Sequence, residues 1–215
     1  MPLPSEGPGV DWTHPIRATR LLCGGLVAAH LLGAAWLWLT MDADLLAMLF
    51  LDRPRELRIA VGGQHQVLIE RGAQWRWLSS VFLHTGAVHL AVNVTGLWAL
   101  GRLLEPWIGG ARWLGVFVGG GLCGSIASSM VGATQSDGAS GGGFALMGAL
   151  WVLAWRVRTQ LHPEDRRLFG PVLSGFLLLN LALGLAIPFV DAAAHAGGLI
   201  FGVLAGWLLA PPSRA

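Results

Sequence analysis

The 215-residue chain contains no lysine and no tyrosine, only two cysteines, and few charged residues of either sign. Charged residues make up 12% of it, whereas 54% of its residues are hydrophobic. A soluble domain typically carries roughly 25% charged residues, so this composition excludes an ordinary soluble domain and predicts an integral membrane protein. Its arginines are scattered along the chain and the net charge is +2, so no nucleic-acid partner is indicated.

The two cysteines, Cys23 and Cys123, both lie within apolar runs. A disulfide between them is therefore not expected, and neither has neighbouring residues that could complete a metal site. We interpret both as small packing residues, and we predict no metal ion and no cofactor for this chain.

Six stretches without Asp, Glu, Lys or Arg organise the chain. They cover residues 21–41, 77–101, 113–136, 138–155, 168–190 and 192–213. A helix needs about 20 apolar residues to cross a bilayer, and these runs lack the period-two alternation of a barrel. We therefore predict an all-α membrane protein, a six-transmembrane-helix bundle that forms a single domain over residues 18–213. The first run has no small-residue cleavage site, so we expect a span there and not a cleaved leader.

The positions of the arginines predict how the bundle is oriented. Arginines precede the first run and fill the second and fourth connections, whereas the third and fifth connections contain only Asp137 and Asp191. Positively charged loops remain in the cytoplasm, so both termini are predicted to be cytoplasmic. Residues 1–17, which contain four prolines in the sequence, are expected to form an extended cytoplasmic tail.

The first connection, residues 42–76, is too long for a plain turn. Its five arginines are balanced by five acidic residues, and the apolar clusters LLAMLF and VLI lie between these charges. Such a pattern indicates a segment in the membrane interface. The connection is then a lid or a substrate-facing wall; a partly ordered surface loop is the alternative.

Ser140 lies in the run GASGGGFALMG, near the start of the fourth apolar stretch. A lone serine in a membrane helix commonly bonds a backbone carbonyl. Here Gly138 and residues 141–143 surround it, at a helix N-terminus where free N–H groups converge. Such groups can stabilise an oxyanion, and glycine lets a peptide come close. Ser140 is therefore a candidate nucleophile.

His195 lies in the run DAAAHAGGLIFG, near the start of the sixth stretch. Its helical face continues through small residues whose spacing lets another helix approach closely, namely Gly198, Gly202 and Gly206. The fourth stretch offers a matching small face at Gly141, Ala145 and Gly148. A histidine here could simply bond a backbone carbonyl. The matching faces instead predict that His195 meets Ser140 as its base.

Asp191 precedes His195 by one helical turn and could be read as the acid of a triad. An Asp that opens the run DAAAH is a favourable N-cap, however, and its carboxylate is then committed to backbone N–H groups. We interpret Asp191 as the cap of the sixth helix.

His89 and Asn93 lie four residues apart in the run FLHTGAVHLAVN, so they share one helical face. Both can donate hydrogen bonds into a cavity, and one such donor contributes about 3 kcal/mol to stabilising an oxyanion. A helix–helix hydrogen bond is the alternative. A zinc site is not expected, because no carboxylate or third ligand lies near in the sequence.

These motifs resemble those of the rhomboid intramembrane serine proteases of the bacterial six-span type. The family's His-x-x-x-Asn falls on His89 and Asn93, and its Gly-x-Ser-Gly falls on residues 138–141. Its Ala-His-x-x-Gly-x-x-x-Gly falls on residues 194–202, and the similarity begins at a Trp-Arg pair, residues 75–76. The glycine run after the serine is longer than in typical relatives, and we expect it to loosen the start of the fourth helix.

The resemblance implies a serine endopeptidase that cleaves peptide bonds in or near the transmembrane helices of membrane proteins. Ser140 would be the nucleophile and His195 the general base of a dyad, with the Ser140 N–H, His89 and Asn93 as the oxyanion hole. Phe144 would stack on the histidine, without the hydroxyl that a tyrosine would add. Transmembrane protein substrates and membrane lipid are the implied partners. The implied location is the bacterial inner (plasma) membrane, with the active site opening to the outer face.

Two other functions compete with this reading. A catalytically inactive rhomboid-like protein would bind membrane helices without cleaving them, but such relatives usually lose the serine or the histidine, and both are present here. A small-molecule transporter should place polar residues in both halves of the bundle. Here the candidate polar residues map to the outer half only, and no inverted repeat is visible.

Overall fold

The computed structural model describes residues 15–132, 136–159, 161, 163–186 and 190–209, and the regular structure within these ranges is entirely helical. The all-α prediction is therefore confirmed. The helices are α1 Arg17–Met41, α2 Leu45–Phe50, α3 Arg55–Ala60, α4 Gln66–Glu70, α5 Arg76–Ser79, α6 Ala87–Ile108, α7 Gly110–Met130, α8 Ser140–Arg156, α9 Pro163–Arg167, α10 Leu173–Ala186 and α11 Ala192–Leu209. The predicted tail, apart from residues 15–17, lies outside the described residues, as does the end of the sixth run.

Four helices are long and apolar enough to cross a membrane, namely α1, α6, α7 and α11. The protein is thus an integral membrane protein with several apolar helices. The fourth and fifth predicted spans are shorter, because α8 has 17 residues and α10 has 14. A π-helical turn over Leu168–Val172, which contains Pro171, joins α9 to α10. Proline removes an intrahelical hydrogen bond, so it interrupts the regular α-helix there. The count of six spans stays a prediction.

The second span begins ten residues later than the sequence predicts, at Ala87 and not at Trp77. Residues before it form α5 and a 3₁₀ turn over Ser80–Phe82, and the backbone at Gly86 is extended. The helix also continues past Arg102 to Ile108. The predicted bounds of this span, which rest on the absence of charged residues alone, are therefore wrong at both ends.

Glu105 is a buried carboxylate within α6, and its hydrogen bonds to the start of α1 compensate for its burial. One carboxylate oxygen accepts the backbone N–H of Ala18 at 2.9 Å. The other accepts the backbone N–H of Thr19 at 2.9 Å and its hydroxyl at 2.6 Å. The N-cap of α1, Ile16, supplies no side-chain hydrogen bond. Glu105 therefore caps α1 from a neighbouring helix, where a negative charge also favours the helix dipole.

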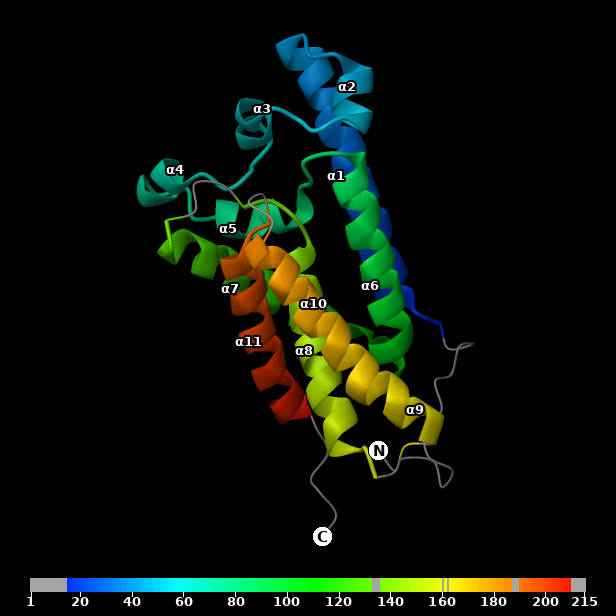
Figure 1. Cartoon of the computed structure of the whole chain (residues 1–215). Coiled ribbons are helices and arrows are strands. Elements are labelled where there is room, and N and C mark those ends of the chain that lie inside the picture. Colours follow the sequence, from blue (N-terminus) through cyan, green and yellow to red (C-terminus); the bar gives the residue numbers. More distant parts are fainter. Residues whose placement is uncertain (1–14, 133–135, 160, 162, 187–189, 210–215) are drawn as a thin grey trace.

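The helices α7, α8 and α11 form the tightly packed part of the bundle, and α1 pairs with α6 beside it (Figure 1). Small residues allow the close approach of α8 and α11. A Cβ atom on Gly198 would overlap the backbone of Gly141, and one on Gly202 would overlap the carbonyl of Ala145. The predicted pairing of these small faces is confirmed, and it brings the first turns of α8 and α11 together.

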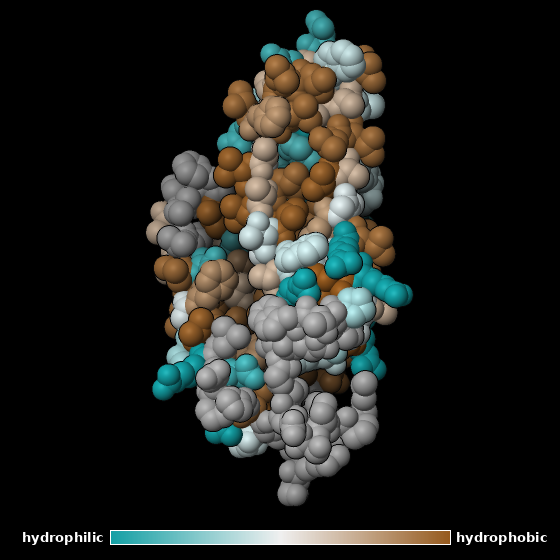
Figure 2. Space-filling view, turned by 90° about the vertical axis from the view of Figure 1, so that its right-hand side faces the viewer, coloured by the Kyte–Doolittle hydropathy of each residue, from teal (hydrophilic) through white to brown (hydrophobic). Residues whose placement is uncertain are grey.

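The first connection is folded into three short helices, α2 to α4, and α5 begins at its last residue, Arg76. Figure 1 shows α3, α4 and α5 over one end of α7, while α2 lies beside the C-terminal end of α1. The cluster LLAMLF is α2, and its Leu46 and Phe50 are 68% and 64% exposed. Hydrophobic side chains gather over the upper part of the face in Figure 2, where α1 and α2 lie. The location of the first connection in the membrane interface stays a prediction.

Candidate active site

The turn before α8 places Ser140 as the first residue of that helix. Gly138 has a φ of +142°, a conformation that favours glycine. A Cβ atom on Gly138 would lie 2.8 Å from Cε1 of His89, so a larger residue would also push that ring away. The helix is regular from Ser140 onward, since the N–H of Gly143 already donates to the carbonyl of Ala139. The expected loosening of its start is not observed.

Ser140 and His195 form a direct hydrogen bond. Their Oγ and Nε2 atoms are 2.8 Å apart, although the residues are 55 positions apart in the sequence. His195 lies in the first turns of α11 and is only 8% exposed. The contact between these side chains that the sequence predicts is present, in the geometry that a nucleophile and its base require.

Asp191 points its carboxylate away from this pair. Its Oδ1 atom accepts the N–H of Ala194 at 2.9 Å, and its Oδ2 atom accepts the hydroxyl of Ser128 at 2.5 Å. The predicted N-cap is therefore confirmed. Within the described part of the chain, Nδ1 of His195 has no hydrogen-bond partner. The site thus contains a serine–histidine pair without a carboxylate behind the histidine.

Phe144 supports the histidine in another way. Its ring stacks on that of His195, with the centroids 4.2 Å apart and the planes inclined by 17°. Phe144 lies one turn after Ser140 on α8, so one helix supplies both the hydroxyl and the stacking ring. The aromatic contact expected from the sequence is present.

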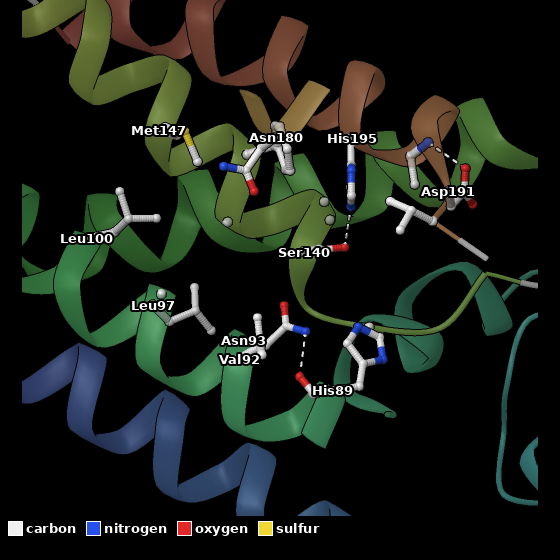
Figure 3. Close-up of a pocket in the computed structure, with 18 of the residues that line it drawn as sticks. His89, Val92, Asn93, Leu97, Leu100, Ser140, Met147, Asn180, Asp191 and His195 are labelled. Carbon is white, nitrogen blue, oxygen red and sulfur yellow. Dashed lines mark hydrogen bonds between the residues drawn. The ribbon is translucent and has the colours of Figure 1, made fainter. Parts of the chain in front are cut away.

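His89 and Asn93 lie on α6, on the opposite side of the pocket from His195 (Figure 3). The Asn93 amide donates to the carbonyl of His89 at 3.0 Å. An amide nitrogen carries two hydrogens, so one remains for a ligand. Nδ1 of His89 lies 3.3 Å from the hydroxyl of Thr85, which fixes the direction of the ring. Among the described residues, neither side chain is hydrogen-bonded to Ser140, but all four candidates line one pocket.

This pocket has a volume of about 940 Å³ and lies between α6, α8 and α10. Its lining includes charged residues, among them Asp52 and Arg58, as well as the four candidates. The remaining lining is mostly apolar, including Leu97, Leu100, Met147, Leu150 and Phe176. A mostly apolar pocket with a few polar groups is suited to a largely hydrophobic peptide.

Two polar residues near the pocket, Asn180 and Ser128, are not among those predicted from the sequence. Asn180 on α10 lines it and donates to the carbonyl of Phe176 at 2.8 Å (Figure 3). Asn180 could have been predicted from the sequence, because an amide inside a long apolar run is a functional hypothesis by default. Ser128 carried no such signal, because its partner Asp191 is 63 positions away.

The rhomboid domain family matches residues 71–212, which is more than half of the chain. The chain therefore belongs to the rhomboid family. All four candidate residues lie within the matched region, and the family resemblance seen in the motifs is confirmed.

Three relatives show how far this similarity extends. The chain is 36% identical over 157 residues to Rhomboid protease GluP of Bacillus subtilis, covering 73% of this chain and 30% of that protein. It is 34% identical over 152 residues to RHOMBOID-like protein 5 of Arabidopsis thaliana, covering 69% and 48%. It is 32% identical over 134 residues to Rhomboid protease GlpG of Pectobacterium atrosepticum, covering 60% and 46%. The chain thus spans less than half the length of each of these relatives.

Proposed function

We propose that this protein is an intramembrane serine endopeptidase that cleaves peptide bonds in or near the transmembrane helices of membrane proteins. The observation that carries the proposal is the 2.8 Å hydrogen bond between Ser140 Oγ and His195 Nε2 at the starts of two apolar helices. Family membership supports it, because two of the similar proteins are named rhomboid proteases.

In the first half of the reaction, Oγ of Ser140 attacks the carbonyl carbon of the substrate while Nε2 of His195 takes the hydroxyl proton. The oxyanion that forms is stabilised by the Ser140 N–H and by donors from His89 and Asn93. The bond to the leaving nitrogen then breaks, and His195 gives its proton to that amine. The products are the free amine fragment and an ester on Ser140.

In the second half, a water molecule attacks the ester carbonyl while His195 takes one of its protons. The ester bond to Ser140 breaks as the tetrahedral species collapses, and the proton on His195 returns to Oγ. A carboxylic acid fragment leaves, and both side chains regain their starting states. Because Asp191 is committed to Ala194 and Ser128, stacking by Phe144 keeps the imidazole in place through both halves.

The proposal includes the membrane arrangement. We infer six spans in one domain over residues 18–213, with α8 and α10 as the fourth and fifth, both termini cytoplasmic, and the site opening to the outer face of a bacterial inner membrane. Ser140 and Arg156 are the first and last residues of α8, a 17-residue helix that is about 25 Å long. Arg156 stacks over Trp207 and Arg158 over Trp155, and such aromatic and cationic side chains favour a membrane interface.

Labelling with a serine-directed fluorophosphonate tests the dyad. The purified protein in detergent should be labelled and should cleave a reporter transmembrane substrate, whereas Ser140→Ala and His195→Ala should do neither. Labelling or cleavage that persists in Ser140→Ala would contradict the proposal. A wild-type protein that binds the substrate helix but is neither labelled nor active would instead support the inactive helix-binding alternative.

A further inference from the structure

The segment that leads to Ser140 is fastened to the first connection through Asp137. The side chain of Asp137 is fully buried, with 0% of it exposed. Its Oδ2 atom accepts a hydrogen bond from Nη1 of Arg58 at 3.0 Å, and its Oδ1 atom accepts the backbone N–H of Gln64 at 2.9 Å. Both the helix α3 and the turn that follows it therefore hold this carboxylate.

The groups that hold Asp137 are themselves fixed. Nε of Arg58 donates to the carbonyl of Arg53, and the Arg58 carbonyl accepts the N–H of Gly63 at 2.8 Å. Nη1 of Arg76 donates to the carbonyls of Ile59 and Gly63, both at 2.8 Å. Burial lowers the pKa of the Arg76 guanidinium, and the nearby Asp137 carboxylate raises it. The first connection thus presents Arg58 in a preset position.

On the C-terminal side of Asp137, the chain leads directly to the proposed reaction centre. The N–H of Gly138 donates to the carbonyl of Ser80 at 3.0 Å, and Gly138 packs against the ring of His89. Ser140 follows two residues later as the first residue of α8. The short segment 137–139 is therefore the physical link between the hydroxyl of Ser140 and the ring of His89.

We infer that Arg58 and Asp137 are a positioning pair, which holds segment 137–139 so that Ser140 and His89 keep the separation that the reaction needs. This inference rests on the proposed function. If Arg58 is lost, the buried carboxylate loses this ion pair, and the N–H of Gln64 holds it less firmly to the first connection, so that segment 137–139 can shift. A displacement of about 1 Å at a nucleophile can cost about 100-fold in rate.

The test compares Arg58→Ala, Asp137→Asn and their double variant with Gln66→Ala, which removes the exposed hydrogen bond to Glu70 on the same connection. Time courses of fluorophosphonate labelling give a rate constant, and their plateau gives the folded fraction. Each variant of the pair should lower the rate constant and kcat by about 10- to 100-fold, with KM within about 2-fold of wild type. The double variant should be no slower than the slower single variant, and Gln66→Ala should match wild type.

Two further variants keep the test decisive if Arg58→Ala does not fold. Arg58→Lys retains the charge and should recover part of the rate. A Cβ atom on Gly63 would lie 2.7 Å from the carbonyl oxygen of Arg58 and 2.9 Å from Oδ1 of Asp137, so Gly63→Ala pushes the two partners apart without removing a charge and should also slow labelling. The inference is overturned if the pair's variants change only the plateau, or if their effects multiply in the double variant. The proposed dyad fails separately, if Ser140→Ala is still labelled.

Discussion

The ring of Phe144 lies parallel to the ring of His195 at 4.2 Å between centroids, inclined by only 17°. In a triad, a carboxylate would hold the far nitrogen of the histidine. Here Asp191 bonds Ala194 and Ser128 instead. The stacking contact is therefore the interaction that sets the plane of the imidazole, and activity should depend on the ring of Phe144 more than on the charge of Asp191.

Replacing Phe144 with leucine should lower kcat about 10-fold, because the imidazole can then tilt out of line with Ser140. Phe144→Tyr keeps the ring and serves as the control, with turnover within about 3-fold of wild type. Cleavage of a reporter membrane substrate measures both variants. Wild-type turnover in Phe144→Leu would show that the stacking does not orient the base.

Replacing Asp191 with asparagine should leave turnover within about 3-fold of wild type, since an amide oxygen can still accept the N–H of Ala194. Asp191→Ala removes the cap and should lower the free energy of unfolding by about 1 kcal/mol while Ser140 is still labelled. Fluorophosphonate labelling and thermal unfolding in detergent follow the two effects. A rate loss in Asp191→Asn as large as that of His195→Ala would restore Asp191 to a catalytic triad.

Replacing Asn93 with alanine should slow cleavage by about 100-fold or more, because one of the proposed donors to the oxyanion is lost. The thermal unfolding midpoint should change little, since the lost hydrogen bond lies within one helix, to the carbonyl of His89. Turnover and unfolding are measured on the same preparation. If Asn93→Ala no longer accumulates as a folded protein, the residue has a packing role.

Replacing Gly202 with alanine should destabilise the bundle by about 3 kcal/mol, at the upper end for overpacking, because the clash is with the backbone of Ala145 and not with a flexible side chain. It should also reduce labelling, since α8 and α11 carry Ser140 and His195. Gly115→Ala on α7 is the matched control, because a Cβ atom there meets nothing within 4 Å. Equal unfolding midpoints for the two variants would contradict the close helix contact.

Replacing Glu105 with alanine should destabilise the protein by about 3 kcal/mol, because the buried N–H groups of Ala18 and Thr19 lose their acceptor. The exposed Glu70 supplies the control, and Glu70→Ala should change stability by less than about 0.5 kcal/mol. Thermal unfolding in one detergent compares the two variants, and limited proteolysis near Arg17 reports whether α1 has detached. An unaltered α1 in Glu105→Ala would show that this cap is dispensable.

The parts of the fold that the sequence predicted depend on signals carried by neighbouring residues. Helices occupy all six apolar runs, Asp191 caps α11 three residues ahead of Ala194, and the small faces of α8 and α11 meet. Because those faces carry Ser140 and His195 near their first turns, the contact between these residues could also be predicted. Apolarity, capping and small-residue spacing act within a few residues, so they can be read without the tertiary structure.

Other features depend on residues that only the fold brings together. A charge-free run placed the start of α6 at Trp77, but the helix begins at Ala87 and tolerates Glu105 because α1 supplies three hydrogen-bond donors. Arg58 and Asp137, 79 positions apart, appeared only as two charges in separate connections. The sequence by itself determined that the six apolar runs contain helices and which of their faces are small enough to meet. The tertiary structure decided which buried charges find partners, because that pairing requires distant segments to lie within hydrogen-bond distance.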